Sequence, residues 1–174
     1  MSLSCPADGK ITGAQIDNAC ISHYNDSSFE HMVQPGMVYI SQPTEIGAIY
    51  SKAELTKISD VCKRYNMPLF IDGARLGYAL ASEENDVTLE DLCNLCDVFY
   101  IGGTKCGALF GEAVVITNDK LKKDFRYNIK QNGGMLAKGR LLGIQFDCLF
   151  KDNTYIEICK KAVTQAKLIA KTFI

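Results

Sequence analysis

The sequence has 174 residues, of which 47% are hydrophobic and 22% are charged, and its formal net charge is −1. A chain of this length can bury one substantial hydrophobic core, so we expect a globular protein. The balanced charge argues against nucleic acid or an anionic membrane surface as a partner, and no apolar run approaches the roughly 20 residues of a membrane-spanning helix.

The first predicted elements are a helix and a strand. Thr12 can cap a short helix that runs to about residue 24, and residues 25–36 are rich in loop-forming residues. Residues 37–41 form an apolar run typical of a buried strand. We expect the chain to continue in an extended conformation over residues 46–50.

A helix, a strand and a short helix follow. Ser51 and Glu54 have the spacing of a capping box, which predicts a helix that ends near residue 66. Residues 69–72 predict the next strand, which stops at an aspartate and a glycine. Residues 74–82 predict a short helix.

The middle of the chain repeats this alternation. Thr88 with Asp91 predicts a further helix start, and residues 98–101 predict a strand. A strand over residues 112–117 should run antiparallel to that strand, because the link between them is short. The alternation indicates an α/β fold, namely a three-layer unit with a mostly parallel sheet, followed by C-terminal helices.

The last third of the chain predicts three helices. The first covers residues 119–130, the second opens at Asn132-Gly133-Gly134, and the third runs from about residue 153 to the end. The backbone amides at the two glycines could bind an anion, or the glycines could be a plain helix break. The final amphipathic helix has no stop signal, so we expect the sequence to be part of a longer protein.

The eight cysteines lie mostly within apolar segments, where a thiol serves as a small buried hydrophobic group. This placement favours a reducing compartment, and we therefore expect a cytoplasmic location. Cys93 and Cys96 form a C-x-x-C pair, but no second pair stands at zinc spacing, so we expect no metal site.

Lys105 follows a hydrophobic run and two glycines on a turn of small residues. Glycines let the backbone approach a ligand closely, and a lysine that loses its proton can attack a carbonyl. Asp72 ends the preceding strand of the predicted parallel sheet. Ligands bind beyond the carboxyl ends of such strands, where both residues are expected.

A pyridine-type cofactor that carries an aldehyde would need both of these residues. Its aldehyde forms an imine with a lysine amine, and its ring nitrogen needs a buried carboxylate to stay protonated, because the cationic ring is the electron sink. Lys105 and Asp72 fit these two demands, and Arg75 could reach a polar atom of the ring or a substrate carboxylate.

Two segments carry a resemblance to a known family. Residues 70–76 read F-I-D-G-A-R-L and residues 99–107 read F-Y-I-G-G-T-K-C-G. They resemble the two signatures of the threonine aldolase and β-eliminating lyase group, whose members are pyridoxal-phosphate enzymes with the aspartate-aminotransferase-like fold. Residues 40–47, 110–115 and 132–140 resemble the same group, so the likeness covers nearly the whole chain in order.

The resemblance implies a role for four residues. Lys105 would be the Schiff-base lysine and Asp72 the partner of the pyridine nitrogen, and Arg75 and Thr104 would also bind the cofactor, pyridoxal 5'-phosphate. The implied reaction is the cleavage of threonine or allo-threonine, small amino-acid substrates, to glycine and acetaldehyde. Members of the group form homo-oligomers, so a dimer or tetramer is expected.

The chain departs from the family pattern at both ends. An upstream phosphate-binding loop and ring-stacking histidine are not matched, and His23 and His31 fit neither position. We expect residues 1–150 to be a partial cofactor-binding large domain, and residues 151–174 to be a helix that leads toward a small C-terminal domain. The chain alone is therefore expected to be inactive or nearly so.

Other interpretations remain open at this stage. Lys105 could be a surface lysine, Asp72 could cap the helix that follows it, and Arg75 could pair with Asp72 or Glu83. The reaction could instead be a β-elimination on another amino acid, such as tyrosine or tryptophan. A chain that acts only by association is the third alternative.

Overall fold

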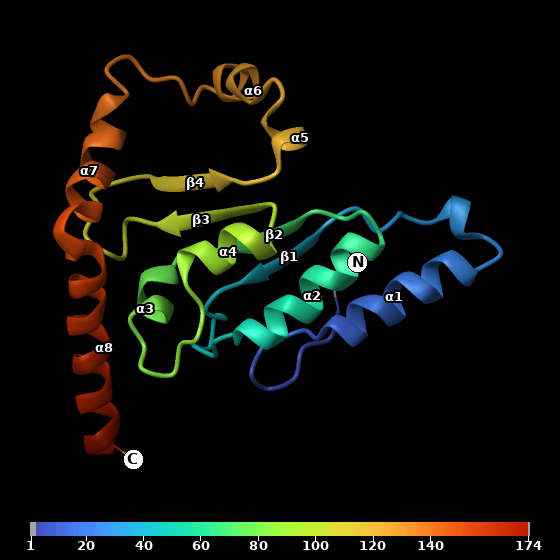
Figure 1. The fold of residues 1–174 in the computed structure, drawn as a ribbon, viewed down its shortest axis with the longest axis horizontal. Coiled ribbons are helices and arrows are strands. Elements are labelled where there is room, and N and C mark those ends of the chain that lie inside the picture. Colours follow the sequence, from blue (N-terminus) through green and yellow to red (C-terminus); the bar gives the residue numbers. More distant parts are fainter. Residues whose placement is uncertain (1–2, 174) are drawn as a thin grey trace.

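A four-stranded sheet is the centre of the computed structural model, which describes residues 3–173 (Figure 1). The strands lie in the order β1 (Val38–Ser41), β2 (Leu69–Asp72), β3 (Val98–Gly102) and β4 (Glu112–Ile116). The first three are parallel, and β4 is antiparallel to β3. This topology confirms the predicted α/β class, its mostly parallel sheet and the direction of the last strand.

Three helices begin at the residues that the sequence predicts. Each cap hydroxyl accepts a hydrogen bond from the backbone N–H three residues on, and the side chain of that third residue accepts one from the cap backbone N–H, as in a capping box. These helices are α1 (Gly13–Asn25) after Thr12, α2 (Lys52–Arg64) after Ser51, and α4 (Leu89–Leu95) after Thr88.

The sheet has one buried face and one more exposed face, because side chains alternate along each strand. The buried face belongs to the same core cluster as Leu55 and Ile58 of α2. Its strand residues are Val38, Ile40, Leu69, Ile71 and Phe99. The other face carries aromatic side chains, among them Tyr39, which is 52% exposed.

The helical third of the chain differs from the prediction in two places. The helix expected over residues 119–130 is two helices, α5 (Asp119–Lys122) and α6 (Phe125–Gln131). Asp124 between them has φ of 57°, and this left-handed conformation breaks the helix. The prediction of one continuous helix was therefore wrong.

The prediction of a helix that opens at Gly133 and Gly134 was also wrong. Helix α7 (Arg140–Phe150) begins later. The backbone N–H of Gly133 donates to the Lys130 carbonyl at 3.1 Å, and that of Gly134 donates to the Ile129 carbonyl at 2.8 Å. Both amides therefore finish α6, and neither is free to bind an anion.

The remaining elements are short except for the last helix. Helix α3 (Leu76–Leu80) is shorter than predicted, residues 46–50 form no strand, and the long C-terminal helix α8 (Thr154–Phe173) is as predicted. Two 3₁₀ turns, η1 (Phe29–His31) and η2 (Lys151–Asn153), complete the described chain. Helices α7 and α8 stand at the end toward which β3 runs (Figure 1). None of the helices over residues 3–173 has both the length and the apolar character that a bilayer crossing requires.

Candidate active site at the strand ends

Asp72 is the last residue of β2, and both of its carboxylate oxygens accept hydrogen bonds. The Tyr39 hydroxyl donates to Oδ2 at 2.5 Å, and the Ala74 backbone N–H donates to Oδ1 at 3.0 Å. Helix α3 has no side-chain cap, and its N-cap residue is Arg75. The interpretation of Asp72 as a helix cap is therefore wrong, and the carboxylate is held at the strand end.

The surroundings of Asp72 favour its charged form. Burial alone raises the pKa of this carboxyl, but hydrogen bonds from Tyr100, Tyr39 and Ala74 outweigh burial and bring the pKa below its ordinary value. The positive charge of Lys105 lowers the same pKa further. Asp72 is thus an ionised acid at neutral pH.

Lys105 lies on the turn that follows β3, with an exposed side chain, and Thr104 beside it is exposed too. Two side chains hold the backbone of this turn by hydrogen bonds. The Tyr78 hydroxyl of α3 donates to the Lys105 carbonyl, and the Gly103 N–H donates to Glu112 Oε2 at 2.8 Å. The structure therefore presents an exposed amine on a hydrogen-bonded turn.

Glycines join the Asp72 turn to the Lys105 turn. The Gly102 N–H donates to the Gly73 carbonyl at 2.8 Å. A Cβ on Gly73 would lie 1.9 Å from the Tyr100 carbonyl oxygen, and a Cβ on Gly102 would lie 2.2 Å from the Ala74 carbonyl oxygen. The close approach that these two glycines allow is therefore between two turns of the chain itself, which brings Asp72 and Lys105 to the same edge of the sheet.

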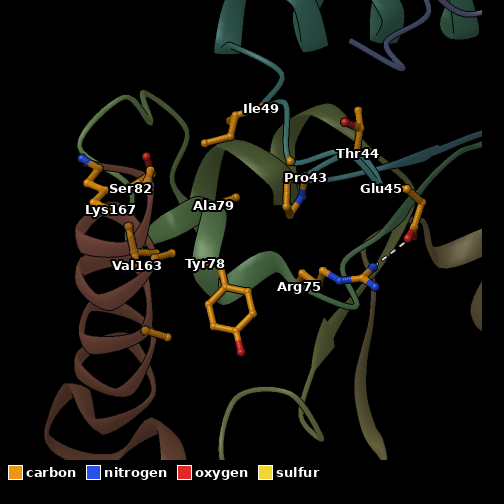
Figure 2. Close-up of a pocket in the computed structure, with 14 residues that line it drawn as sticks. Pro43, Thr44, Glu45, Ile49, Arg75, Tyr78, Ala79, Ser82, Val163 and Lys167 are labelled. Atoms are coloured by element: carbon orange, nitrogen blue, oxygen red, sulfur yellow. Dashed lines mark hydrogen bonds and ion pairs between the residues drawn. The ribbon is translucent and has the colours of Figure 1, made fainter. Parts of the chain in front are cut away.

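Arg75 forms an ion pair that the sequence did not predict. Its guanidinium lies 3.0 Å from Glu45 Oε1, and Figure 2 shows this contact. Neither Asp72 nor Glu83 is its partner, because Glu83 pairs with Lys167 at 2.7 Å, so both predicted pairings were wrong. The Glu45 side chain is 73% exposed, and an exposed pair of this kind contributes little stability, so Arg75 can exchange Glu45 for another anion.

A pocket of about 500 Å³ adjoins these residues. It lies between the segment after β1, helix α3 and helix α8, with mostly apolar walls (Figure 2). Arg75 and Tyr78 contribute to its lining, whereas Asp72 and Lys105 do not. The pocket therefore lies beside the turn that leads from Asp72 into α3.

Tyr155 of α8 joins helix α3 to the end of β3 and was not identified from the sequence. Its hydroxyl donates to the Gly102 carbonyl at 2.9 Å and accepts from the Gly77 N–H at 3.1 Å, and the residue is 4% exposed. No local pattern marks this tyrosine, because both of its partners are distant in sequence. Tyr39 and Tyr100 did carry a weak signal, since each lies on a strand adjacent to Asp72.

We expect Tyr155→Phe to lower the free energy of unfolding by about 1–3 kcal/mol, because it leaves a buried N–H and a buried carbonyl without their partner. Urea unfolding followed by circular dichroism measures this change. Tyr127→Phe is the matched control, because Tyr127 is 76% exposed and should tolerate the change. Equal stabilities of the two variants would contradict the anchoring role of Tyr155.

The chemistry of Asp72 and Lys105 matches what a pyridine cofactor with an aldehyde needs. An ionised carboxylate can accept a hydrogen bond from a protonated ring nitrogen, and an exposed amine on the adjacent turn can bind an aldehyde carbon. Both groups lie at one edge of the sheet, beyond the carboxyl ends of neighbouring parallel strands.

Comparisons with known proteins identify the family of this chain. The family model described as "Beta-eliminating lyase" matches residues 2–172. A low specificity L-threonine aldolase from Pseudomonas sp. (strain NCIMB 10558) is 33% identical over 165 residues, which are 93% of this chain and 46% of that protein. An alanine racemase from Cochliobolus carbonum is 30% identical over 140 residues, 79% of this chain and 35% of that protein.

A solved structure of a threonine aldolase is also similar to this chain. The threonine aldolase of Leishmania major has a TM-score of 0.91 and 49% sequence identity, and the match covers 98% of this chain and 48% of that one. The chain thus spans about half the length of the threonine aldolases that it matches. By the match along almost all of its length, the chain belongs to the beta-eliminating lyase family.

Proposed function

We propose that the protein containing this chain is a pyridoxal-phosphate-dependent aldolase that cleaves threonine or allo-threonine to glycine and acetaldehyde. The observation that carries the proposal is the ionised Asp72 carboxylate beside the Lys105 turn, in a chain 49% identical to a threonine aldolase of known structure. When bound, the cofactor supplies a cationic ring that accepts the electron pair of the broken carbon–carbon bond.

Each residue of the site has one task in this proposal. Asp72 accepts a hydrogen bond from the ring nitrogen and keeps that nitrogen protonated. The Lys105 amine would hold the cofactor at its aldehyde carbon, the electrophile that the group supplies. Arg75 leaves Glu45 and pairs with a carboxylate, and Thr104 contributes a hydroxyl group next to the lysine.

The proposal extends to the state of the protein. The chain spans about half of its relatives, so we propose that it is inactive or nearly so in isolation. We further propose a homo-oligomer, a dimer or tetramer, in the cytoplasm, where reduced thiols such as those of Cys20 and Cys62 persist.

A second reaction type on the same scaffold is supported by one specific relative. The Cochliobolus protein is an alanine racemase, so the shared residues are compatible with proton exchange at the α-carbon as well as with bond cleavage beyond it. β-Elimination on another amino acid would use the same Asp72 and Lys105, and binding without chemistry would use neither.

Product analysis of the complete protein distinguishes these reactions. We expect acetaldehyde from threonine or allo-threonine, with much less pyruvate from serine or cysteine and little racemisation of alanine. Acetaldehyde is measured by a coupled alcohol dehydrogenase assay, pyruvate by a coupled lactate dehydrogenase assay, and racemisation by chiral chromatography. Pyruvate or racemised alanine as the main product would replace the aldolase assignment, and no product at all would favour association without chemistry.

A further inference from the structure

Two tyrosines stand on either side of Asp72 on the more exposed face of the sheet. Tyr39 lies on β1 and Tyr100 on β3, the two neighbours of β2. Phe70 lies between their rings. The Tyr39 and Phe70 rings are stacked with centroids 5.2 Å apart, and the Phe70 and Tyr100 centroids are 6.1 Å apart.

The Tyr39 phenol donates a hydrogen bond to Asp72, and Tyr100 stands on the strand at the other side of β2. The contact between Tyr39 and Oδ2 raises the pKa of the Tyr39 hydroxyl. Burial raises the pKa of Tyr100, and its contact with Asp72 raises it further. Each hydroxyl therefore keeps its proton at neutral pH, and a protonated phenol beside a carboxylate can only donate.

We propose that Tyr39 and Tyr100 are positioning residues, whose hydroxyl groups fix the Asp72 carboxylate in the orientation that receives the ring nitrogen of the cofactor. This inference rests on the proposed function, and neither tyrosine belongs to the residues that the family resemblance implies. The Ala74 N–H holds Oδ1 and the Tyr39 hydroxyl holds Oδ2. A carboxylate has about four lone-pair positions, so Asp72 can still accept a hydrogen bond from the ring nitrogen of the cofactor.

The packing of both tyrosine rings against Phe70 makes this role separable from structural support. In a Tyr→Phe variant the ring still packs against Phe70, and only the hydroxyl is lost. The variant therefore changes the hydrogen bonding of Asp72 without opening a cavity. A merely structural role for the tyrosines would leave the titration of Asp72 unchanged.

The test uses the complete protein with Tyr39→Phe, Tyr100→Phe and the double variant. Tyr65→Phe is the matched control, because the Tyr65 hydroxyl also donates to an aspartate, Asp17 Oδ1, at 2.8 Å, in a contact between α1 and the end of α2. Thermal unfolding by circular dichroism verifies that the variants fold.

The first readout needs no cofactor. The carboxyl carbon of Asp72 is titrated by ¹³C NMR, and we expect its pKa to rise in both single variants and most in the double variant, whereas Tyr65→Phe leaves it unchanged. The second readout is the dissociation constant for pyridoxal phosphate, which we expect to increase about tenfold in the double variant.

The outcomes separate the inference from the proposed function. An unchanged titration of Asp72 in the double variant overturns the inference, and so does an unchanged dissociation constant when the wild-type protein binds the cofactor. Failure of the wild-type protein to bind pyridoxal phosphate overturns the proposed function, and the inference falls with it.

Discussion

Lys105→Ala is expected to abolish covalent capture of pyridoxal phosphate by the complete protein. The amine of Lys105 is the nucleophile that the cofactor aldehyde requires, and alanine has no group that replaces it. The side chain is exposed, so its removal leaves the core intact. The absorbance band of the lysine-bound cofactor should therefore be absent, while the unfolding temperature stays within a few degrees of the wild-type value.

Reduction by borohydride locates the bound amine directly. Reduction converts the link between cofactor and lysine into a stable bond, and peptide mass spectrometry then identifies the lysine that carries the added mass. Lys123→Ala is the matched control. Lys123 is also exposed, but it lies between α5 and α6, away from the carboxyl ends of β2 and β3. Undiminished labelling of the Lys105→Ala variant, with the mass on another lysine, would remove Lys105 from the proposed site.

Gly102→Ala is expected to cost the protein about 3 kcal/mol of unfolding free energy, at the upper end of the usual range for overpacking. The added methyl group would lie 2.2 Å from the Ala74 carbonyl oxygen and 2.8 Å from the Gly73 carbonyl oxygen. Both obstacles are backbone atoms, which cannot move aside as a flexible side chain can. The hydrogen bond from Gly102 to Gly73 should stretch or break, so the two turns separate and cofactor affinity falls together with stability.

Gly143→Ala is the control for the substitution itself. Gly143 lies within α7, and apart from its chain neighbours and the adjacent backbone of the helix, no atom stands within 4 Å of the position that its Cβ would occupy. Alanine should therefore raise stability there by about 0.5–1 kcal/mol, because it favours the helix. Urea unfolding of both variants measures the contrast. If Gly102→Ala and the wild-type protein unfolded at the same urea concentration, the result would contradict the tight contact between the two turns.

Features that depend on neighbours in sequence were predictable. A capping box needs only a hydroxyl residue and a polar residue three positions later, so the starts of α1, α2 and α4 could be predicted from the chain. A parallel sheet follows from alternating strands and helices, and it places the residues that end adjacent strands at one edge. The position of Asp72 and Lys105 at one edge of the sheet could therefore be predicted from the chain.

Features that depend on how distant segments meet were not predictable. Several acidic residues could pair with Arg75 as far as the sequence shows. Only the folded structure identifies Glu45 as the partner, 30 positions away. Tyr39 donates to Asp72 across 33 positions, and Tyr155 reaches Gly102 across 53. No local pattern encodes these pairs, because each one exists only after strands align or α8 docks.

The sequence by itself therefore determined the α/β class, the starts of α1, α2 and α4, and the presence of an acid and an amine after adjacent strands, since these follow from short-range spacing and side-chain chemistry. Only the tertiary structure decided which groups surround that acid and how the two turns touch. The physical reason is that hydrogen-bond partners and glycine contacts are selected by the three-dimensional packing of segments that are far apart in the chain.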